Sequence, residues 1–228
     1  MISVVLAAYN GGEYIKAQLE SVLSQLDEGD EVVISDDKPS GTTKGAIEDI
    51  LSSDPRVKYI EGPAKGVIKN FEHAIKNAKG DYIFLCDQDD IWLDGKVEAV
   101  MNEFKKGAVV VMHDAKVVNN DLEVTENSFF AAHGSGTGTV KNIIRNTYIG
   151  CCMAFSAELK GHILPFPDNL PMHDQWIGLL GERIGKVSLI DTPYLLYRRH
   201  DGTATGGATS FAQKLKWRIA IITSLMRK

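Results

Sequence analysis

Apolar residues in the first half of the chain switch repeatedly between short continuous runs and helical spacing. Residues 2–8 form the first run, which is typical of a strand buried on both faces. After a turn at residues 9–12, apolar residues recur at helical spacing over residues 15–26, which indicates a helix. The same pattern predicts four further strands, with helices between them, at residues 31–35, 57–60, 81–86 and 108–112.

Strict alternation of strand and helix predicts an α/β fold with a mostly parallel central sheet and helices on both faces. Ligands of such sheets bind beyond the carboxyl ends of the strands. Three predicted strands end in polar clusters, namely Tyr9-Asn10, Asp36-Asp37 and residues 87–90. We therefore expect these clusters to converge on one crevice.

The second half of the chain is less regular. A glycine-rich loop at residues 134–138 precedes a strand-like segment at 150–156. A helix is predicted at residues 173–184 and one or two strands at 187–199. This half lacks the strict alternation, and we expect it to hold a second substrate beside the one bound at the strand ends.

A chain of 228 residues is compatible with a single domain, because one core can grow to about 250 residues. Neither an internal repeat nor a long linker divides it. We predict one domain over residues 1–209, in which residues 1–113 would bind a nucleotide and residues 114–209 the other substrate. Residues 210–228 form a separate basic amphipathic helix.

Composition narrows the class of protein. Hydrophobic residues make up 44% and charged residues 24%, which is ordinary for a globular protein. The net charge of −5 excludes nucleic acid as an obvious partner. The three cysteines lie in apolar runs, which indicates buried free thiols in a reducing compartment. No signal peptide or membrane span is recognisable, so we expect a cytoplasmic protein.

Asp87-Gln88-Asp89 follows the predicted strand at residues 81–86. Carboxylates crowded at one point raise each other's pKa, and a divalent cation that prefers oxygen ligands relieves the repulsion. A metal at this position points to a substrate that carries phosphate. The alternative is a helix N-cap with surplus acids.

Three further motifs carry candidate chemistry. A carboxylate of Asp36-Asp37 can accept the imide N–H of a pyrimidine, although a polar turn has the same composition. Asp174 opens a predicted helix, where it would be either a general base or a plain N-cap. His200 can ligate a metal beside the cations Arg198 and Arg199, and the alternative is a solvated basic turn.

In order and spacing, these motifs resemble those of family 2 glycosyltransferases, from Met1 to about Thr205. The resemblance is carried by Ala8-Tyr9-Asn10, Asp36-Asp37, Asp87-Gln88-Asp89, His173-Asp174-Gln175-Trp176 and Tyr197-Arg198-Arg199-His200. It implies the GT-A fold and transfer, with inversion, of a sugar from a nucleotide-diphospho-sugar such as a UDP- or dTDP-sugar. Residues 86–92 and 148–155 look most like bacterial, rhamnosyltransferase-like enzymes of surface polysaccharide synthesis.

The resemblance also implies a role for each matching residue. Asp174 would be the catalytic base, and Asp89 with His200 would hold Mn²⁺ or Mg²⁺. Tyr9 and Asp37 would contact the base of the nucleotide. The full set of residues expected to bind the nucleotide-sugar is Ala8, Tyr9, Asn10, Asp36, Asp37, Lys65, Asn70, Asp87, Gln88 and Arg199.

Two other classes of protein compete with this interpretation. A nucleotidyltransferase usually has a basic phosphate loop after its first strand, whereas Asn10-Gly11-Gly12-Glu13 offers no cation. A non-catalytic relative that binds sugar nucleotides would not need Asp89, Asp174 and His200. A saccharide or lipid-linked acceptor is the expected second substrate.

Residues 210–228 contain five basic residues and no acid, which leaves −10 on the rest of the chain. The helical stripe here consists of Phe211, Leu215, Ile219, Ile222 and Met226. A basic amphipathic helix of this kind lies on an anionic membrane surface, here the inner face of the cytoplasmic membrane, or packs on its own domain or on a second subunit of a homodimer. The sequence leaves these alternatives open.

Overall fold

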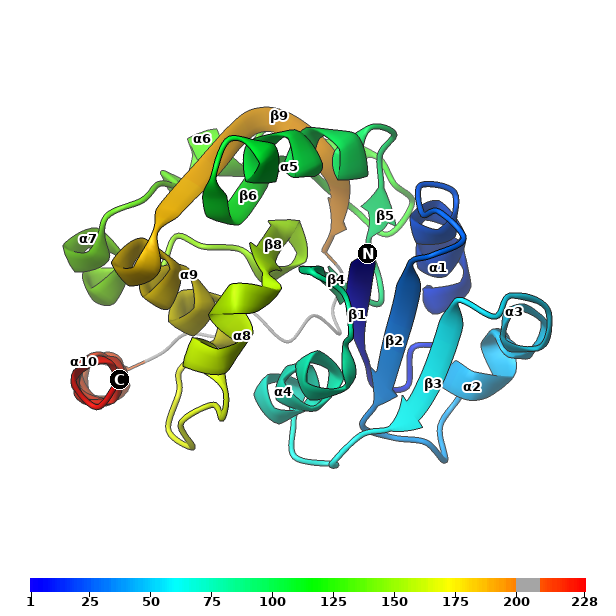
Figure 1. Ribbon diagram of the computed structural model, residues 1–228, viewed down its shortest axis with the longest axis horizontal. Coiled ribbons are helices and arrows are strands. Elements are labelled where there is room, and N and C mark those ends of the chain that lie inside the picture. Colours follow the sequence, from blue (N-terminus) through cyan, green and yellow to red (C-terminus); the bar gives the residue numbers. More distant parts are fainter. Residues whose placement is uncertain (200–209) are drawn as a thin grey trace.

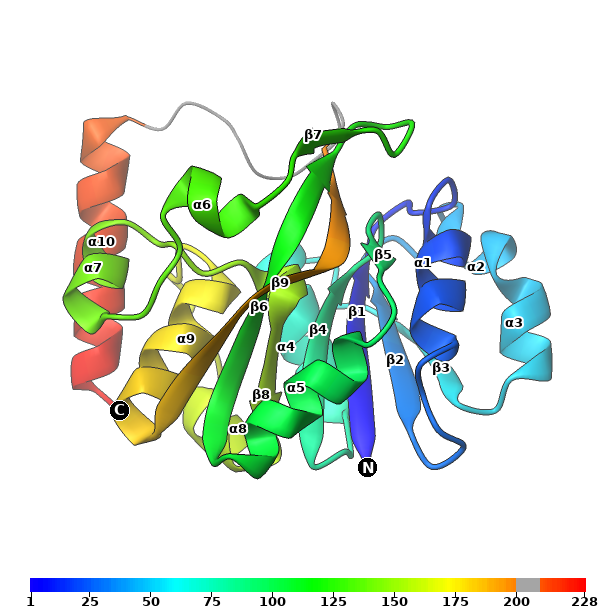
Figure 2. The same ribbon diagram turned by 90° about the horizontal axis from the view of Figure 1, so that it is seen from above.

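The computed structural model describes residues 1–199 and 210–228, the latter without the side chain of Phe211. The predicted metal ligand His200 lies outside the described residues. A single twisted sheet runs through the molecule, with helices packed on both of its faces (Figures 1 and 2). Its strand order is β3-β2-β1-β4-β8-β6-β9-β5, and β7 pairs with β6.

The first four strands are parallel, as the sequence predicts. They are β1 (Ile2–Ala8), β2 (Glu31–Asp36), β3 (Val57–Glu61) and β4 (Tyr82–Asp87). β1 lies between β2 and β4, where Ala8 pairs with Asp36 and Ala7 pairs with Asp87. This register places the carboxyl ends of three strands side by side, as expected.

Five helices accompany these strands in the first half of the chain. They are α1 (Ile15–Leu23), α2 (Thr43–Ala46), α3 (Glu48–Ser53), α4 (Val67–Asn77) and α5 (Lys96–Lys105). The single helix expected at residues 43–52 is thus broken at Ile47. Gly45 weakens the helix just before the break, and the side chain of Ile47 is fully buried in the core.

The second half contributes strands to the same sheet. These are β7 (Val124–Glu126), β8 (Met153–Ser156) and β9 (Lys186–Arg198), which join the first-half strands β5 (Ile91–Trp92) and β6 (Ala108–Val118). β8 is antiparallel and lies between β4 and β6, whereas β9 is parallel to β6. The sheet is therefore mostly parallel, as predicted, although β6 is longer than expected and residues 187–199 supply one strand.

The helices of the second half gather around β8 and at one end of the molecule. They are α6 (Phe129–His133), α7 (Thr139–Ile144), α8 (Ala157–Ile163), α9 (His173–Ile184) and α10 (Phe211–Met226). A 3-10 turn, η1 (Gly150–Cys152), begins the segment that was expected to be wholly strand. None of the described helices is long and apolar enough to cross a membrane.

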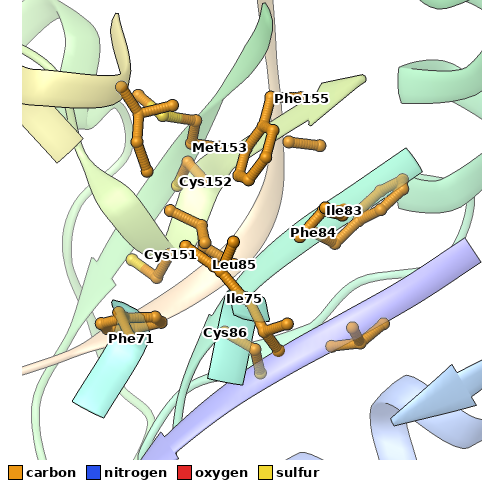
Figure 3. Close-up of a cluster of buried hydrophobic side chains, with 14 of the residues drawn as sticks. Phe71, Ile75, Ile83, Phe84, Leu85, Cys86, Cys151, Cys152, Met153 and Phe155 are labelled. Atoms are coloured by element: carbon orange, nitrogen blue, oxygen red, sulfur yellow. The ribbon is translucent and has the colours of Figure 1, made fainter. Parts of the chain in front are cut away.

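The core is continuous across the junction of the two halves. Figure 3 shows Phe71 and Ile75 of α4 beside the apolar residues of β4 and of residues 151–155. The three cysteines are buried free thiols, as predicted. Because β4 is packed on both faces, its carboxyl end is held rigidly. The residues that follow it therefore have a well-defined position.

Candidate active site

A cavity of about 510 Å³ opens at the carboxyl ends of β1 and β4. Its strand wall consists of Ala8, Tyr9, Asp37, Asp87, Gln88 and Asp89. Its helix wall consists of Asn146, Tyr148, Gly150, His173 and Asp174. Asn70 and Arg199 also line the cavity, so most of the predicted site residues meet in one place.

Three predicted residues do not line the cavity. Asp36 is buried beneath it, where its carboxylate accepts hydrogen bonds from the Tyr59 hydroxyl at 2.7 Å and from the Lys38 N–H at 3.0 Å. Asn10 occupies the turn after β1 with φ 52°, and Lys65 is exposed beside the lining residue Gly66. Asp36 therefore supports the strand wall from below.

Asp37 and Asn70 fasten the loop that follows β3 to the strand ends. The Asp37 carboxylate accepts hydrogen bonds from the N–H groups of Ala64 at 2.9 Å and Gly66 at 2.7 Å. The Asn70 amide donates to the carbonyls of Ala8 at 3.0 Å and Ser35 at 2.8 Å, while its own oxygen is buried without a partner. These bonds hold β1, β2 and the start of α4 in one arrangement.

The side chain of Gln88 positions Tyr9 at the mouth of the cavity. The Tyr9 N–H donates to the Gln88 oxygen at 2.9 Å, and the Gln88 amide donates to the Tyr9 carbonyl at 3.2 Å. A Cβ on Gly11 would lie 2.2 Å from the Gln88 oxygen, so any larger residue there would displace the Gln88 side chain from Tyr9. The ring of Tyr9 is consequently presented to solvent, 60% exposed, with the Lys38 ammonium 5.5 Å from its centre.

The carboxylates at the end of β4 repel one another. Burial raises the pKa of Asp87 to about 7, with further contributions from the charges of Asp89 and Asp174. Burial also raises the pKa of Asp90 well above its usual range, and Asp89 and Asp87 add to the effect. The buried Lys96 offsets this effect at Asp87 only in part.

A hard cation would find oxygen ligands here. Among the described residues, the donor atoms of Asp87, Asp90 and Cys151 lie within 4.8 Å of one another. Burial raises the pKa of the Cys151 thiol well above its usual value, so the sulfur stays protonated and is a poor ligand for Mg²⁺ or Mn²⁺. One oxygen of Asp90 is buried with no hydrogen-bond partner. The donor set thus suits a cation that prefers carboxylates.

Asp174 stands in the first turn of α9 and is only 6% exposed. One of its oxygens accepts hydrogen bonds from the Asn146 amide at 3.0 Å and the Gln175 N–H at 2.6 Å. Burial raises the pKa of Asp174 to about 6, while these bonds and a backbone bond from Gly150 lower it. A carboxylate with this pKa is ionised at neutral pH and can still take a proton.

His173 and Gly150 pack tightly beside Asp174. The His173 ring stacks on Phe71 with 4.1 Å between ring centres, and burial lowers its pKa to about 3, so it is neutral. A Cβ on Gly150 would lie 2.8 Å from His173 Nε2, so this contact depends on glycine. The packing fixes the start of α9 and with it the Asp174 side chain.

Several contributing residues escaped the sequence interpretation. Arg198 donates from Nε to the Asp89 carbonyl at 2.8 Å, donates to the Asn120 carbonyl, and lies 4.9 Å from the Tyr14 ring centre. It thereby holds the loop that carries Asp89, although only its neighbour Arg199 was assigned a role. Asn146 had no sequence signal at all, because it meets Asp174 only through folding.

Residues 3–162 match the family model described as Glycosyl transferase family 2. The chain is 29% identical over 153 residues to the Escherichia coli UDP-Glc:alpha-D-GlcNAc-diphosphoundecaprenol beta-1,3-glucosyltransferase WfgD, covering 66% of this chain and 58% of that protein. It is 26% identical over 231 residues to the Shigella flexneri dTDP-rhamnosyl transferase RfbG, covering 92% of this chain and 77% of RfbG.

The fold is similar to that of S. aureus TarS residues 1–349, solved in complex with UDP-GlcNAc. The TM-score is 0.76 at 19% identity, and the match covers 99% of this chain and 66% of that one. The chain therefore spans 58% of WfgD and about two thirds of the solved TarS chain. This similarity confirms the predicted GT-A fold.

Proposed function

Because the chain belongs to glycosyltransferase family 2, we propose that it transfers a sugar from a nucleotide-diphospho-sugar to a saccharide or lipid-linked acceptor, with inversion at the anomeric carbon. The observation that carries this proposal is the shared cavity of Asp87, Asp89 and Asp174. Asp87 and Asp89 would lie at the charged end of a donor, and Asp174 would lie at the hydroxyl of an acceptor.

The names of the relatives support a role in bacterial surface polysaccharide synthesis. WfgD is named for UDP-glucose and a diphosphoundecaprenol-linked acceptor, and RfbG for a dTDP-rhamnosyl group. We propose a UDP- or dTDP-sugar as the donor here. A lipid-linked acceptor would place the enzyme in the cytoplasm at the inner face of the membrane, with residues 210–228 as the region of contact.

The nucleotide would occupy the strand wall, which belongs to residues 1–113. Tyr9 offers an exposed ring on which a base can stack, with Lys38 beside it. Asp37 and Asp87 lie farther along the same wall, for the imide of the base and for the ribose or sugar. Residues 114–209 supply the helix wall, where the acceptor would bind.

The carboxylates of the strand wall fit a divalent cation, Mn²⁺ or Mg²⁺. We propose that Asp89 holds it together with His200, and Asp87 lies close enough to share its field. When bound, the metal would act as a Lewis acid that neutralises charge on the diphosphate leaving group. The chain contributes by fastening the Asp89 loop through Arg198 and by keeping the neighbouring Asp90 buried.

Asp174 would remove the proton of the acceptor hydroxyl as the oxygen attacks. One bond forms between the acceptor oxygen and the anomeric carbon, and the bond between that carbon and the diphosphate oxygen breaks. The proton goes to the Asp174 carboxylate, which Asn146 and the Gln175 N–H hold in place. A single displacement of this kind inverts the configuration and requires no covalent intermediate.

A donor screen tests the proposal. The protein is incubated with Mn²⁺ and a panel of UDP-, dTDP- and GDP-sugars, and release of the nucleoside diphosphate is measured with and without EDTA. We expect metal-dependent release from a UDP- or dTDP-sugar, because water slowly replaces the acceptor. Absence of both donor binding and nucleotide release across the panel would contradict the proposed function.

A further inference from the structure

Two neighbouring helices present apolar side chains to solvent. On α10 the exposed fractions are 47% for Leu215, 54% for Ile219 and 81% for Met226. On α7 they are 71% for Val140 and 58% for Ile144. Side chains of this size are costly to leave in water, so grouped exposure on adjacent elements indicates a contact surface.

The opposite side of α10 already packs on the protein. Ile221 is fully buried there, and Trp217 is half-buried. Arg218 joins the helix to α7 by donating to the Ile144 carbonyl from Nε at 3.1 Å and from Nη2 at 2.8 Å. Both views of the molecule show α7 and α10 side by side (Figures 1 and 2). The exposed stripe therefore belongs to a docked helix.

Basic residues flank the exposed stripe of α10. At 100° per residue, Lys214 and Arg218 lie on one side of it, and Lys216 and Arg227 on the other. With Lys228, residues 210–228 carry five basic residues and no acid, whereas the rest of the chain carries −10. A surface of anionic headgroups would attract this end of the molecule and repel the remainder, which fixes the orientation of binding.

We infer that the α7–α10 face, defined as Val140, Ile144, Leu215, Ile219, Ile222 and Met226, docks on an anionic lipid bilayer. An apolar stripe between two rows of cations is the arrangement that such an interface binds. A second copy of the chain is a poorer occupant, because a two-fold contact through this face would bring the same cations together. The inference rests on the proposed function in one respect only, namely that docking on the bilayer would give the enzyme access to a lipid-linked acceptor.

The docking face also borders the acceptor side of the cavity. Asn146, two residues beyond the Ile144 carbonyl that Arg218 binds, donates to Asp174 at 3.0 Å. The Gln175 amide donates to the Asn142 carbonyl of α7 at 2.6 Å. A bilayer on the α7–α10 face would thus lie next to the segment that holds the helix wall, and an acceptor anchored in it would approach Asp174 from that side.

Vesicle sedimentation tests the inference. The unaltered chain is mixed with vesicles of phosphatidylcholine, with or without about a third phosphatidylglycerol, and the bound fraction is measured against salt. We expect binding only to the anionic vesicles, weakened by salt. Leu215→Ser with Ile219→Ser should lower the partition coefficient at least about tenfold, because two aliphatic side chains no longer insert.

The matched control is Leu122→Ser with Val124→Ser, which removes similarly exposed apolar side chains elsewhere (40% and 47% exposed). It should bind as the unaltered chain does. No binding to anionic vesicles, or full binding by the Leu215/Ile219 variant, would overturn the inference. So would a dimer, seen by sedimentation velocity without lipid, that the same variant dissociates. Donor binding and nucleotide release in lipid-free solution report on the proposed function separately, since neither involves this face.

Discussion

The acids of the strand wall and the acid of the helix wall have different environments. Beyond the effect of burial, the charge of Asp89 raises the pKa of both Asp87 and Asp90, and the charge of Asp87 raises the pKa of Asp90 further. Asp174 owes its raised pKa of about 6 chiefly to burial, and hydrogen bonds from Asn146 and the Gln175 N–H work in the opposite direction. The charge of Lys96 offsets the repulsion at Asp87 only in part, whereas Asp174 is a single carboxylate that accepts hydrogen bonds from Asn146 and the Gln175 N–H.

This contrast assigns a separate task to each wall. Crowded acids whose repulsion is offset only in part are stabilised when they are protonated or when a cation binds, which favours metal and diphosphate recognition. A lone, hydrogen-bonded carboxylate with a pKa near 6 can exchange a proton under working conditions. Substitutions that remove one charge at a time should therefore separate donor binding from transfer.

The largest expected effect is on transfer in Asp174→Asn. Loss of a general base lowers kcat by about 10³-fold, within the usual range for such groups. The dissociation constant of the donor, measured by calorimetry with Mn²⁺, should stay within about twofold, since asparagine keeps the bonds from Asn146 and Gln175. If the variant transfers sugar at the normal rate, the proposal that Asp174 of the helix wall acts as the general base is wrong.

Asp89→Asn should act on the strand wall instead. Loss of a metal ligand should weaken metal-dependent donor binding by about 10²-fold, because several kcal/mol of charge stabilisation are forfeited. Calorimetry with and without Mn²⁺ measures the difference. Asp121→Asn, which alters an exposed acid that does not line the cavity, is the matched control. Equal donor affinity in Asp89→Asn and the unaltered chain would break the proposed division of tasks.

Asp174→Asn should also stabilise the ligand-free protein. The folded pKa of about 6 exceeds the ordinary value of 3.8, so the folded state binds the proton more tightly and loses stability as pH rises from about 4 to 6. At pH 7 the free energy of unfolding should rise by about 3 kcal/mol in the variant, which no longer buries this charge. Urea denaturation at pH 7 and pH 4 measures the gain, which should vanish at the lower pH. A gain independent of pH would point to a cause other than ionisation.

The smallest effect concerns the pH profile. kcat should fall as pH drops through about 6, by about tenfold at pH 5, because protonated Asp174 cannot accept the acceptor proton. Asn146→Ala removes a hydrogen bond that lowers the pKa of Asp174, so the acid limb should move to higher pH. Initial rates from pH 5 to 8 with saturating donor measure both. An unmoved limb would show that Asn146 does not act on the base.

The parallel strands β1, β2 and β4 were predictable because each is buried on both faces. Val4, Val5 and Leu6 are fully buried, and such strands show continuous apolar runs. β8 was recognised as strand-like. Its antiparallel position between β4 and β6 was not predicted, because the strands that pair with it are separated from it by long stretches of chain. The break at Ile47, whose side chain is fully buried in the core, was also missed.

The candidate site likewise contains some residues that the sequence predicted and some that it did not. Asp87, Asp89 and Asp174 were found from residue type and position at element ends, and the fold places them in one cavity. Asn146, Gly150 and Arg198 were not assigned roles, although they orient the acids. Their contribution is a contact across the fold, and nothing in the neighbouring sequence marks it.

By itself, the sequence determined the class of sheet and the acids at the ends of its strands. Burial on two faces and the presence of carboxylates can both be recognised from local residue patterns. Only the tertiary structure decided which acids repel one another and which one has hydrogen-bond donors. It also decided which side of α10 is exposed. These properties depend on distance and on the exclusion of water, and both arise only when remote segments pack together.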